Sequence, residues 1–539
     1  MYKIIFKIEG GEDVTVFAVG GANVLELARE ADIPIDAVCS GNGTCGKCRV
    51  RINEEWQLAC QTKITKDMTI YVRVDAPGDP TQGDGSDVSF VRVDAPGDPS
   101  SRFGIAIDIG TTTVAAMLVD LESGNISAKT TTVNAQVSYG ADVINRIIEQ
   151  QKPGGIKKLQ QAIVNKTLLP LLGNLCTSTG VSLDSIKRLT VAANTTMNHL
   201  FLGIDANSIR IEPYQPAFLE FEPLDPASIG LNAAPGAKMI LAPNVGSYVG
   251  GDITAGVLSA ETVSGQKIFS RPEMTLLIDL GTNGEIVFGN EEFLMACACS
   301  AGPAFEGGDI SCGMRATNGA IEAYEIDDTT LKPSFRVIGE SKPAGICGSG
   351  IIDVIAELFR TGVINGKGRF TKSQLRHCGL DPQSHEAEEP FPCFTLVPAS
   401  DSATGKDITI TETDIDNFIR AKGAIFSGVM SLLSPLGFSP SDIDDVLIAG
   451  GIGSGINIKN AISIGMLPDL PPEKYSYIGN SSLSGAYKML ISSDAEEKVK
   501  EIAKNMTYID LSTQLGYMDE FIAACFLPHT DETLFPSLL

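Results

Sequence analysis

Four cysteines within 22 residues are the first feature of this sequence that indicates chemistry. They are Cys39, Cys45, Cys48 and Cys60, separated by five, two and eleven residues. Four thiolates are the complete ligand set of a [2Fe–2S] cluster, and the glycines between them let backbone N–H groups approach the sulfurs. A structural zinc site also uses four cysteines, but usually as two Cys-x-x-Cys pairs on separate turns. The spacing favours the iron–sulfur cluster and leaves zinc as the alternative.

A second pattern, Asp-x-Gly-Thr, follows two apolar, strand-like runs about 170 residues apart, in 103–113 and 276–285. Such a turn can offer successive N–H groups and hydroxyls to phosphates while its aspartate holds Mg²⁺ through water. The sequence has no Gly-x-x-x-x-Gly-Lys-Ser/Thr loop, so a P-loop ATPase is not indicated. A third glycine-rich turn, 450–455, follows another buried strand and would admit a nucleoside. The residues expected at the nucleotide are Asp108, Gly110, Thr111, Thr112, Thr113, Gly281, Thr282, Asn283, Gly284, Gly450, Gly451 and Gly453.

The elements that must hold the cysteines occupy residues 1–78. Alternating apolar residues predict a hairpin over 2–18, Asn23 is expected to cap a helix that runs to Ala31, and further strands end at Ile52 and Val74. This pattern predicts an α+β domain of the β-grasp, ferredoxin type.

Residues 79–102 are rich in Pro, Gly and Asp, and the nonapeptide Val-Arg-Val-Asp-Ala-Pro-Gly-Asp-Pro begins at Val72 and again at Val91. Such a composition predicts an extended, solvated linker.

From 103 to 539, strand-like runs alternate with helical patterns, which predicts α/β layers. The repeated Asp-x-Gly-Thr predicts a duplicated domain with lobes of about 103–270 and 271–539. A proline-rich acidic stretch near 372–393 predicts a surface insertion. Small residues at 421–425 predict a helix that crosses another closely at a hinge.

The cysteine motif resembles that of the vertebrate-type and plant-type [2Fe–2S] ferredoxins, and 103–539 resembles the superfamily of actin, sugar kinases and heat-shock-type ATPases. With the segments 193–199, 298–308 and 345–350, nearly the whole chain resembles the reductive activators of corrinoid-dependent enzymes. The resemblance implies an α+β β-grasp ferredoxin domain followed by an α/β duplicated ribonuclease H-like (actin-like ATPase) domain. The implied cofactors are a [2Fe–2S] cluster, ATP and Mg²⁺.

The implied activity is ATP-dependent transfer of one electron from the cluster to cobalt(II) of a corrinoid protein, which restores cobalt(I) for methyl transfer. In the superfamily, the first connecting helix supplies a polar residue that positions the attacking water, and the matching position is Asp252. Glu285 is the second candidate, and Asp279 is expected to approach the phosphates from the opposite lobe. Either Asp252 or Glu285 could instead cap a helix or bind a more distant water.

The expected partners are a corrinoid protein, an unidentified electron donor and, by resemblance, a second copy of the chain. A formal charge of −25 argues against nucleic acid or an anionic membrane as a partner. The strand-like N-terminus predicts a cytoplasmic protein. Two alternatives are an activator of a radical dehydratase, which couples the same ATPase fold to an electron, and an ATPase scaffold whose cluster only senses redox state.

Five further residues have the side chains of metal ligands. They are Cys297, Cys299, Cys312, Cys347 and His199. We expect the thiols to be buried packing groups and the histidine to lie in a core or cap.

Overall fold

The computed structural model describes most of the chain. The described residues are 1–8, 13–31, 33, 35, 48–53, 55–72, 103–260, 269–327, 332–371, 393–452 and 455–539. The predicted linker 79–102, the ligand candidates Cys39 and Cys45, Gly453 and residues 372–392 of the predicted insertion lie outside them. Among the helices of the described part, none is both long enough and apolar enough to cross a membrane.

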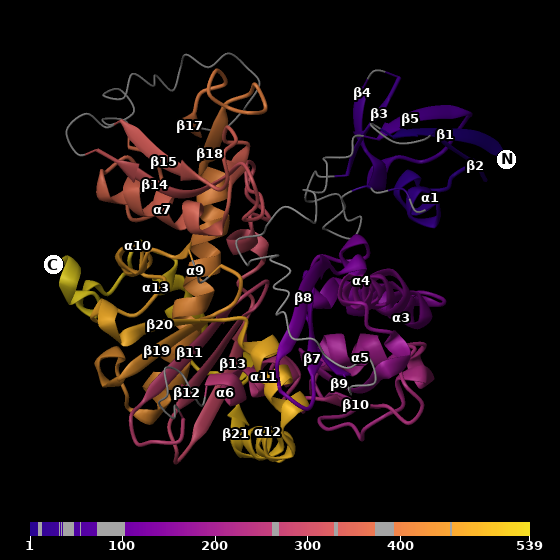
Figure 1. Cartoon of the computed structure of the whole chain (residues 1–539). Coiled ribbons are helices and arrows are strands. Elements are labelled where there is room, and N and C mark those ends of the chain that lie inside the picture. The colour runs from indigo at the N-terminus through magenta and orange to yellow at the C-terminus, as the bar shows by residue number, and fades with distance from the viewer. Residues whose placement is uncertain are drawn as a thin grey trace.

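The N-terminal unit is a five-stranded sheet in the order β2-β1-β5-β3-β4, packed against one helix (Figure 1). The helix, α1, is capped as predicted, because the side-chain oxygen of Asn23 accepts from the N–H groups of Leu25 and Glu26 at 2.9 and 3.3 Å. Ile4, Phe6 and other apolar side chains fill the core between helix and sheet. This arrangement confirms the β-grasp prediction, although the edge strand β4 was not predicted. The elements are β1 Tyr2–Ile8, β2 Val14–Ala18, α1 Val24–Glu30, β3 Arg49–Ile52, β4 Glu55–Leu58 and β5 Met68–Val72.

The first sheet of the large domain has the order β10-β9-β6-β7-β8. Its central strand β6 carries the first Asp-x-Gly-Thr, pairs antiparallel with β7 and pairs parallel with β9. Helices α3, α4 and α5 lie on one side of this sheet in Figure 1. The elements are β6 Phe103–Ile109, β7 Thr113–Asp120, β8 Ile126–Val133, α2 Val143–Gln150, α3 Gly155–Ile163, α4 Leu169–Thr179, β9 Ile186–Ala193, α5 Thr195–Leu202 and β10 Lys238–Leu241.

The second sheet repeats this plan in the order β20-β19-β11-β12-β13-β21. Its strand β11 carries the second Asp-x-Gly-Thr, pairs antiparallel with β12 and pairs parallel with β19, as β6 does with β7 and β9. The shared connectivity confirms the predicted duplication. The strands are β11 Thr275–Leu280, β12 Gly284–Gly289, β13 Leu294–Cys299, β19 Asp445–Ala449, β20 Tyr475–Gly479 and β21 Met506–Tyr508.

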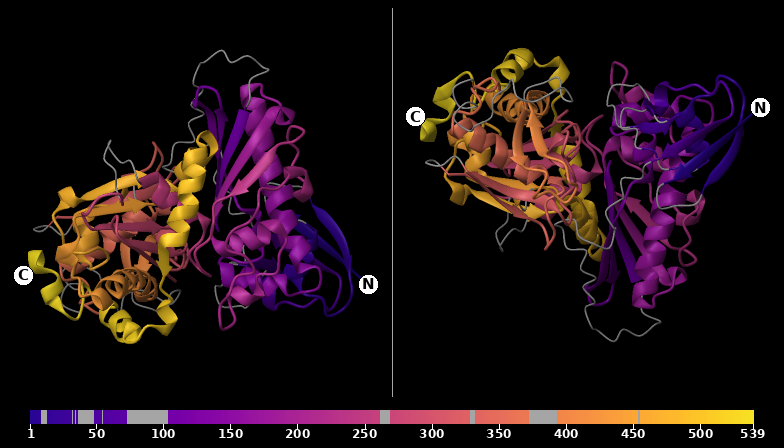
Figure 2. Two further views of the ribbon diagram at one scale, coloured as in Figure 1. Left: turned by 90° about the horizontal axis from the view of Figure 1, so that it is seen from below. Right: turned by 90° about the horizontal axis from the view of Figure 1, so that it is seen from above.

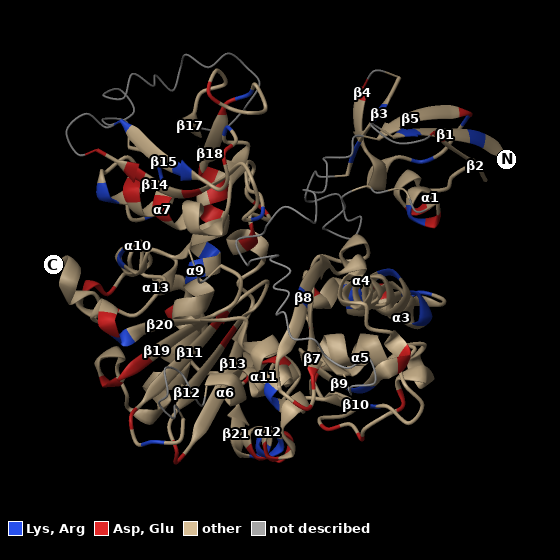
Figure 3. Cartoon of the chain, in the orientation of Figure 1, with Lys and Arg blue, Asp and Glu red and all other residues tan. Residues whose placement is uncertain are grey.

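Three helices fill the space between the two sheets: α6 (Gly251–Ala260), α11 (Ser481–Ile491) and α12 (Ser493–Asn505). One hydrophobic cluster joins buried residues of both sheets with these helices, and Figure 2 shows the C-terminal helices at the boundary between the halves. Helix α11 lies against β6 and β9 of the first sheet although it directly follows β20 of the second sheet in the sequence. Lys and Glu residues of α12 produce the mixed charge at the lower edge of the molecule in Figure 3.

The close helix crossing at the hinge is formed by α6 and α11. A Cβ atom on Gly485 of α11 would lie 1.9 Å from the carbonyl oxygen of Ala255 in α6. The segment 421–425 is helical, as predicted, in α9 (Glu412–Leu433), but its expected place at the hinge is wrong. Helix α9 packs within the second half, where Gly423 lies beside Cys525 after α13 (Tyr517–Ala524). Small residues in a helix indicate that another segment packs closely against it, but they do not indicate which segment that is.

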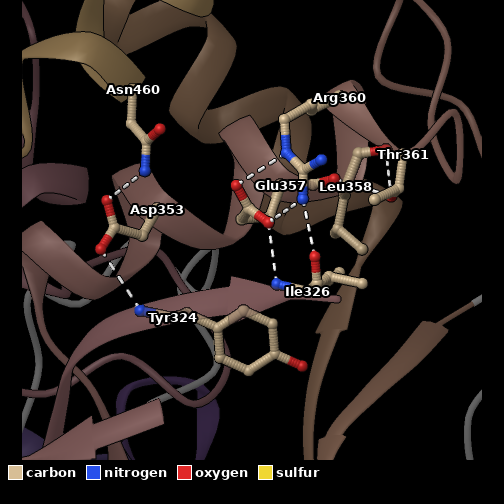
Figure 4. Close-up of polar contacts among 8 residues, drawn as sticks. All are labelled: Tyr324, Ile326, Asp353, Glu357, Leu358, Arg360, Thr361 and Asn460. Atoms are coloured by element: carbon tan, nitrogen blue, oxygen red, sulfur yellow. Dashed lines mark hydrogen bonds and ion pairs between the residues drawn. The ribbon is translucent and has the colours of Figure 1, made fainter. Parts of the chain in front are cut away.

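A small additional layer lies between β13 and α9 in the sequence. In this layer β14 lies between β15 and the short β16, which pairs only with Ala320 and Ile321. Carboxylates of α7 accept from the N–H groups of β14 beyond that pairing (Figure 4): Asp353 accepts from Tyr324 N at 3.3 Å, and Glu357 accepts from Ile326 N at 2.8 Å. Asn460 of α10 donates to Asp353 at 2.7 Å and joins this layer to the helix after the third glycine-rich turn. The elements are β14 Ala320–Ile326, β15 Pro333–Val337, β16 Gly345–Ile346, α7 Gly348–Arg360, β17 Cys393–Val397, β18 Ile408–Thr411 and α10 Ile458–Ser463.

Candidate nucleotide site and cluster site

A cavity of about 600 Å³ lies where β6 and β11 end and meet the third glycine-rich turn. It is lined by all three predicted catalytic carboxylates and by ten of the twelve residues expected at the nucleotide. The lining residues that the sequence singled out are Asp108, Gly110, Thr111, Thr112, Thr113, Asp252, Asp279, Gly281, Thr282, Asn283, Glu285, Gly450 and Gly451. Gly284 does not line the cavity, because it begins β12 beside Ile425 and Cys299. Gly453 lies outside the described residues.

The two Asp-x-Gly-Thr turns touch each other across the cavity. The hydroxyl oxygens of Thr112 and Thr282 are 2.8 Å apart, and the Thr282 hydroxyl lies 2.9 Å from a carboxylate oxygen of Glu306. A carboxylate can only accept, so Thr282 donates to Glu306 and Thr112 donates to Thr282. The two halves of the domain are therefore joined by a chain of hydroxyls at the point where phosphates are expected.

A buried arginine supports the first turn from behind. Arg146 of α2 has no exposed surface, and it donates to the backbone carbonyl of Thr111 at 2.5 Å and to that of Gly140 at 2.8 Å. Burial lowers the pKa of Arg146 to about 9. Asn194 holds the same turn by donating to the Thr111 hydroxyl at 3.1 Å. The position of this turn is thus fixed by side chains about 35 and 83 residues away in the sequence.

Four of the carboxylates that line the cavity, Asp108, Asp252, Asp279 and Glu285, have a raised pKa. Burial is the largest cause in every case, and mutual repulsion adds to it for three of them. The pKa of Asp252 rises to about 7 through burial and the charges of Asp279 and Asp108, and the pKa of Asp279 rises to about 6 through burial. Burial also raises the pKa of Asp108, and burial together with Asp252 and Asp279 raises that of Glu285. A cation placed here would relieve the repulsion among these groups.

The third glycine-rich turn requires glycine for steric reasons. Gly450 has a φ of +96°, and a Cβ there would lie 2.2 Å from the Leu280 carbonyl oxygen and 3.0 Å from a carboxylate oxygen of Asp279. A Cβ on Gly451, in contrast, would meet no atom within 4 Å. The turn is packed against the second Asp-x-Gly-Thr turn on one side and open on the other, which suits the close approach of a ligand to the backbone.

These residues fit a nucleotide bound with a divalent cation. Carboxylates and hydroxyls are oxygen donors, which Mg²⁺ prefers, and Mg²⁺ usually keeps several waters and takes phosphate oxygens as ligands. Within the described residues, no three His, Cys, Asp or Glu side chains are grouped to ligate one ion by themselves. Most of the coordination would therefore come from water and phosphate.

Sequence reasoning missed several polar residues at or beside this cavity. Among them are Arg146, Glu306, Asn480, Ser481 and Ser482. Asn480 carries a readable signal, since an asparagine before a helical run is a common N-cap, and it does cap α11. The pattern of an N-cap does not reveal that the same side chain reaches Asp108.

At the predicted cluster site, the structure describes two of the four cysteines. Cys48 and Cys60 are both buried, and the carbonyl of Cys48 accepts from Ala59 N at 2.7 Å, which brings the two segments together. The side-chain amide of Gln61 lies 3.9 Å from the sulfur of Cys60. Two buried thiols on adjoining segments, one of them beside an N–H donor, suit a metal–sulfur cluster. Cys39 and Cys45 lie outside the described residues.

Cys297, Cys299, Cys347 and His199 are buried as predicted, whereas Cys312 is not fully buried. Cys297, Cys299 and Cys347 are buried, and the sulfurs of all three lie within 3.7 Å of backbone carbonyl oxygens. Burial raises the pKa of both Cys297 and Cys299, so these are unreactive thiols. Cys312 is half-buried. His199 is fully buried, with Nδ1 2.7 Å from the Thr195 carbonyl oxygen and Nε2 accepting from Ala217 N.

Comparison with known families divides the chain into three matched segments. Residues 6–66 match the 2Fe-2S iron-sulfur cluster binding domain, 103–263 match the RACo middle region, and 273–539 match the C-terminal domain of RACo, the ASKHA domain.

Three relatives extend the comparison. A solved structure described as a reductive activator for corrinoid, iron-sulfur protein is 37% identical over the whole of both chains, with a TM-score of 0.73. The corrinoid activation enzyme RamQ of Eubacterium limosum is 29% identical over 93% of this chain and 95% of its own length. A [Co(II) methylated amine-specific corrinoid protein] reductase of Methanosarcina barkeri is 24% identical over 75% of this chain and 73% of its own length.

The coverage at this level of identity, together with the β-grasp domain and the duplicated ATPase fold, shows that the chain belongs to the RACo family of reductive activators of corrinoid proteins.

Proposed function

We propose that this protein uses ATP to drive one electron from its [2Fe–2S] cluster to cobalt(II) of a corrinoid protein, restoring cobalt(I) for methyl transfer. The observation that carries the proposal is the fusion, in one chain, of a cluster-binding domain with a duplicated ATPase domain. That fusion spans the full length of a reductive activator with 37% identity. An electron carrier alone would not need an ATPase domain, and an ATPase alone would not need a cluster.

Free energy from ATP is required if the cluster is a weaker reductant than the acceptor. Plant-type ferredoxins have potentials near −400 mV, and for one electron each 59 mV of deficit is a tenfold bias. A deficit of roughly 120 mV thus corresponds to about 2.8 kcal/mol. Nucleotide binding can supply this amount if the closed ATPase domain binds the reducible conformation of the partner more tightly than other conformations.

The residues around the cavity take the following proposed roles. Asp108 and Asp279, at the ends of equivalent strands, would hold Mg²⁺ through water, and the Thr and Gly residues of the two turns would bind the phosphates. Asp252 would position the attacking water, with Glu285 as the second candidate. A pKa of about 7 lets Asp252 hold or release a proton near neutral pH, as a general base for the attacking water would.

The remaining parts of the proposal rest on the sequence. Cys39, Cys45, Cys48 and Cys60 would ligate the cluster, and the chain would divide into a cluster domain (1–78), a linker (79–102) and an ATPase domain. A cytoplasmic location, a homodimer and a separate electron donor stay predictions.

A single-turnover mixing experiment tests the proposal. The full chain, with its cluster reduced and its iron content measured, is mixed anaerobically with a cobalt(II) corrinoid protein, with and without Mg-ATP. We expect cobalt(I) to form with Mg-ATP in the unmodified chain, and its yield to fall at least about tenfold in Asp279→Asn. A reduced cluster that transfers no electron to the corrinoid under any condition would contradict the proposal.

The same preparation separates the alternatives. A radical-dehydratase activator would carry a [4Fe–4S] cluster between subunits, so its iron content and spectrum would differ from those of a [2Fe–2S] protein. A redox-sensing scaffold would hydrolyse ATP without any electron reaching cobalt.

A further inference from the structure

The N-terminal end of α11 contacts the aspartates of both phosphate-binding turns. Asn480 Nδ2 donates to one carboxylate oxygen of Asp108 at 2.8 Å, and the Ser482 hydroxyl donates to the other at 2.9 Å. The Ser481 hydroxyl donates to Asp279 at 3.1 Å. Three consecutive residues of one helix therefore hold the two carboxylates that lie at equivalent positions in the two halves.

These contacts fix the orientation of Asp108 most completely. Both of its carboxylate oxygens accept from α11, one from an amide and one from a hydroxyl. A carboxylate has about four acceptor positions, so each oxygen keeps a lone pair for a further donor such as a cation-bound water. Donors to an ionised carboxylate are among the stronger hydrogen bonds in proteins, and they select one rotamer of the side chain.

The same helix is anchored to both α6 and the first sheet. Its Gly485 lies directly against the backbone of Ala255 in α6, the helix that begins beside Asp252. Its last turns are fixed by Tyr487, which donates to the Gly124 carbonyl at 2.6 Å, and by Lys488, which donates to two carbonyls at the end of α6. A shift of α11 would therefore move the aspartate donors and the hinge helices together.

We propose that Asn480, Ser481 and Ser482 are positioning residues that orient Asp108 and Asp279 toward the cation of the bound nucleotide, and that α11 thereby couples cation binding to the hinge. The inference deepens the proposed ATPase function and rests on it. The three side chains act through the two carboxylates, and they are not themselves ligands in this proposal.

The test compares variants of the full chain in their binding of a non-hydrolysable ATP analogue, titrated with Mg²⁺ and repeated in EDTA. The double variant Ser481→Ala/Ser482→Ala removes one donor to each aspartate. Asn480→Gly removes the amide that donates to Asp108 and leaves a residue that is also accepted at an N-cap. Ser484→Ala is the matched control, because Ser484 lies in the same helix two residues from Ser482 and lines no part of the cavity.

We expect the Mg²⁺ concentration for half-maximal binding to rise at least about tenfold in the double variant and in Asn480→Gly, which is the scale of losing a hydrogen bond to a charged group. Binding in EDTA should change by less than about twofold, because in this proposal those side chains act through the two aspartates and the cation. Ser484→Ala should match the unmodified chain. Asn480→Gly keeps the inference testable if the double variant does not fold.

Two results would overturn the inference alone: an unchanged Mg²⁺ requirement in both variants, or an equal loss of binding with Mg²⁺ and with EDTA, which would indicate general disruption of the helix. An unmodified chain that binds no nucleotide with Mg²⁺ would overturn the proposed function together with the inference. The behaviour of the unmodified chain thus separates the two failures.

Discussion

Replacing Gly485 by alanine should open the hinge between the two halves of the ATPase domain. The added Cβ would lie 1.9 Å from the Ala255 carbonyl oxygen, 2.4 Å from its carbonyl carbon and 2.7 Å from its Cα. All three are backbone atoms, so no side chain can rotate away. To reach an ordinary contact distance, α6 and α11 must separate by more than roughly 1 Å.

Overpacking of this kind typically costs about 1–3 kcal/mol of unfolding free energy and sometimes more. We expect Gly485→Ala to lie at the upper end of that range, because the atoms that the new Cβ meets all belong to the backbone of α6. Denaturant unfolding followed by circular dichroism measures the loss. Nucleotide binding should weaken in the same variant, since the donors to Asp108 and Asp279 stand at the start of the displaced helix.

Gly173→Ala is the matched control. Gly173 lies in α4, and a Cβ there would meet no atom within 4 Å. The helix propensity of alanine should make this variant more stable by about 0.5–1 kcal/mol. If Gly485→Ala were as stable as the unmodified chain and bound nucleotide equally well, the close α6–α11 crossing would be refuted.

Three further predictions follow from the carboxylates and the cysteines. Without nucleotide, the chain should lose stability as the pH rises from about 4 to 7. The pKa values of about 6 for Asp279 and about 7 for Asp252 exceed the unfolded value near 3.9, so the folded chain binds more protons than the unfolded chain in that window. Asp252→Asn should weaken this pH dependence of the unfolding free energy in urea titrations, and an unchanged pH dependence would contradict the prediction. Asp279→Asn should raise the melting temperature of the nucleotide-free chain by removing a buried charge and should abolish the further rise caused by Mg-ATP, whereas retained stabilisation by Mg-ATP would argue against a role for Asp279. Cys60→Ser should lower the iron content and cluster absorbance, while Cys176→Ala, a buried thiol in the first half, should leave both unchanged; equal iron in the two variants would count against Cys60 as a ligand.

The features that could be predicted from the sequence are those that local chemistry decides. The Asn23 cap and the alternating strands β1 and β2 of the N-terminal unit depend on neighbours within a few residues, and the structure confirms them. The repeated Asp-x-Gly-Thr predicted the duplication, because a strand followed by such a turn is a recognisable local unit. The cavity then brings Asp108 and Asp279 together, although 170 residues separate them.

What the sequence could not reveal depends on distant packing. Nothing near Arg146 indicates that it would be wholly buried beneath the Thr111 carbonyl, since an arginine is usually exposed. The serines at 481 and 482 likewise resemble ordinary residues of a first helical turn. The small residues of 421–425 predicted a close helix contact correctly, but only the fold shows that the contact is with the C-terminal segment and that Gly485 serves the hinge.

The most direct test of the account is to record cluster oxidation and cobalt(I) formation simultaneously in one anaerobic reaction with a corrinoid protein, before and after Mg-ATP is added. The account predicts little change before the addition and afterwards one cobalt(I) formed for each cluster oxidised. Cobalt reduction that proceeds equally without ATP, or ATP hydrolysis with the cluster still reduced, would contradict the proposed coupling of the two domains.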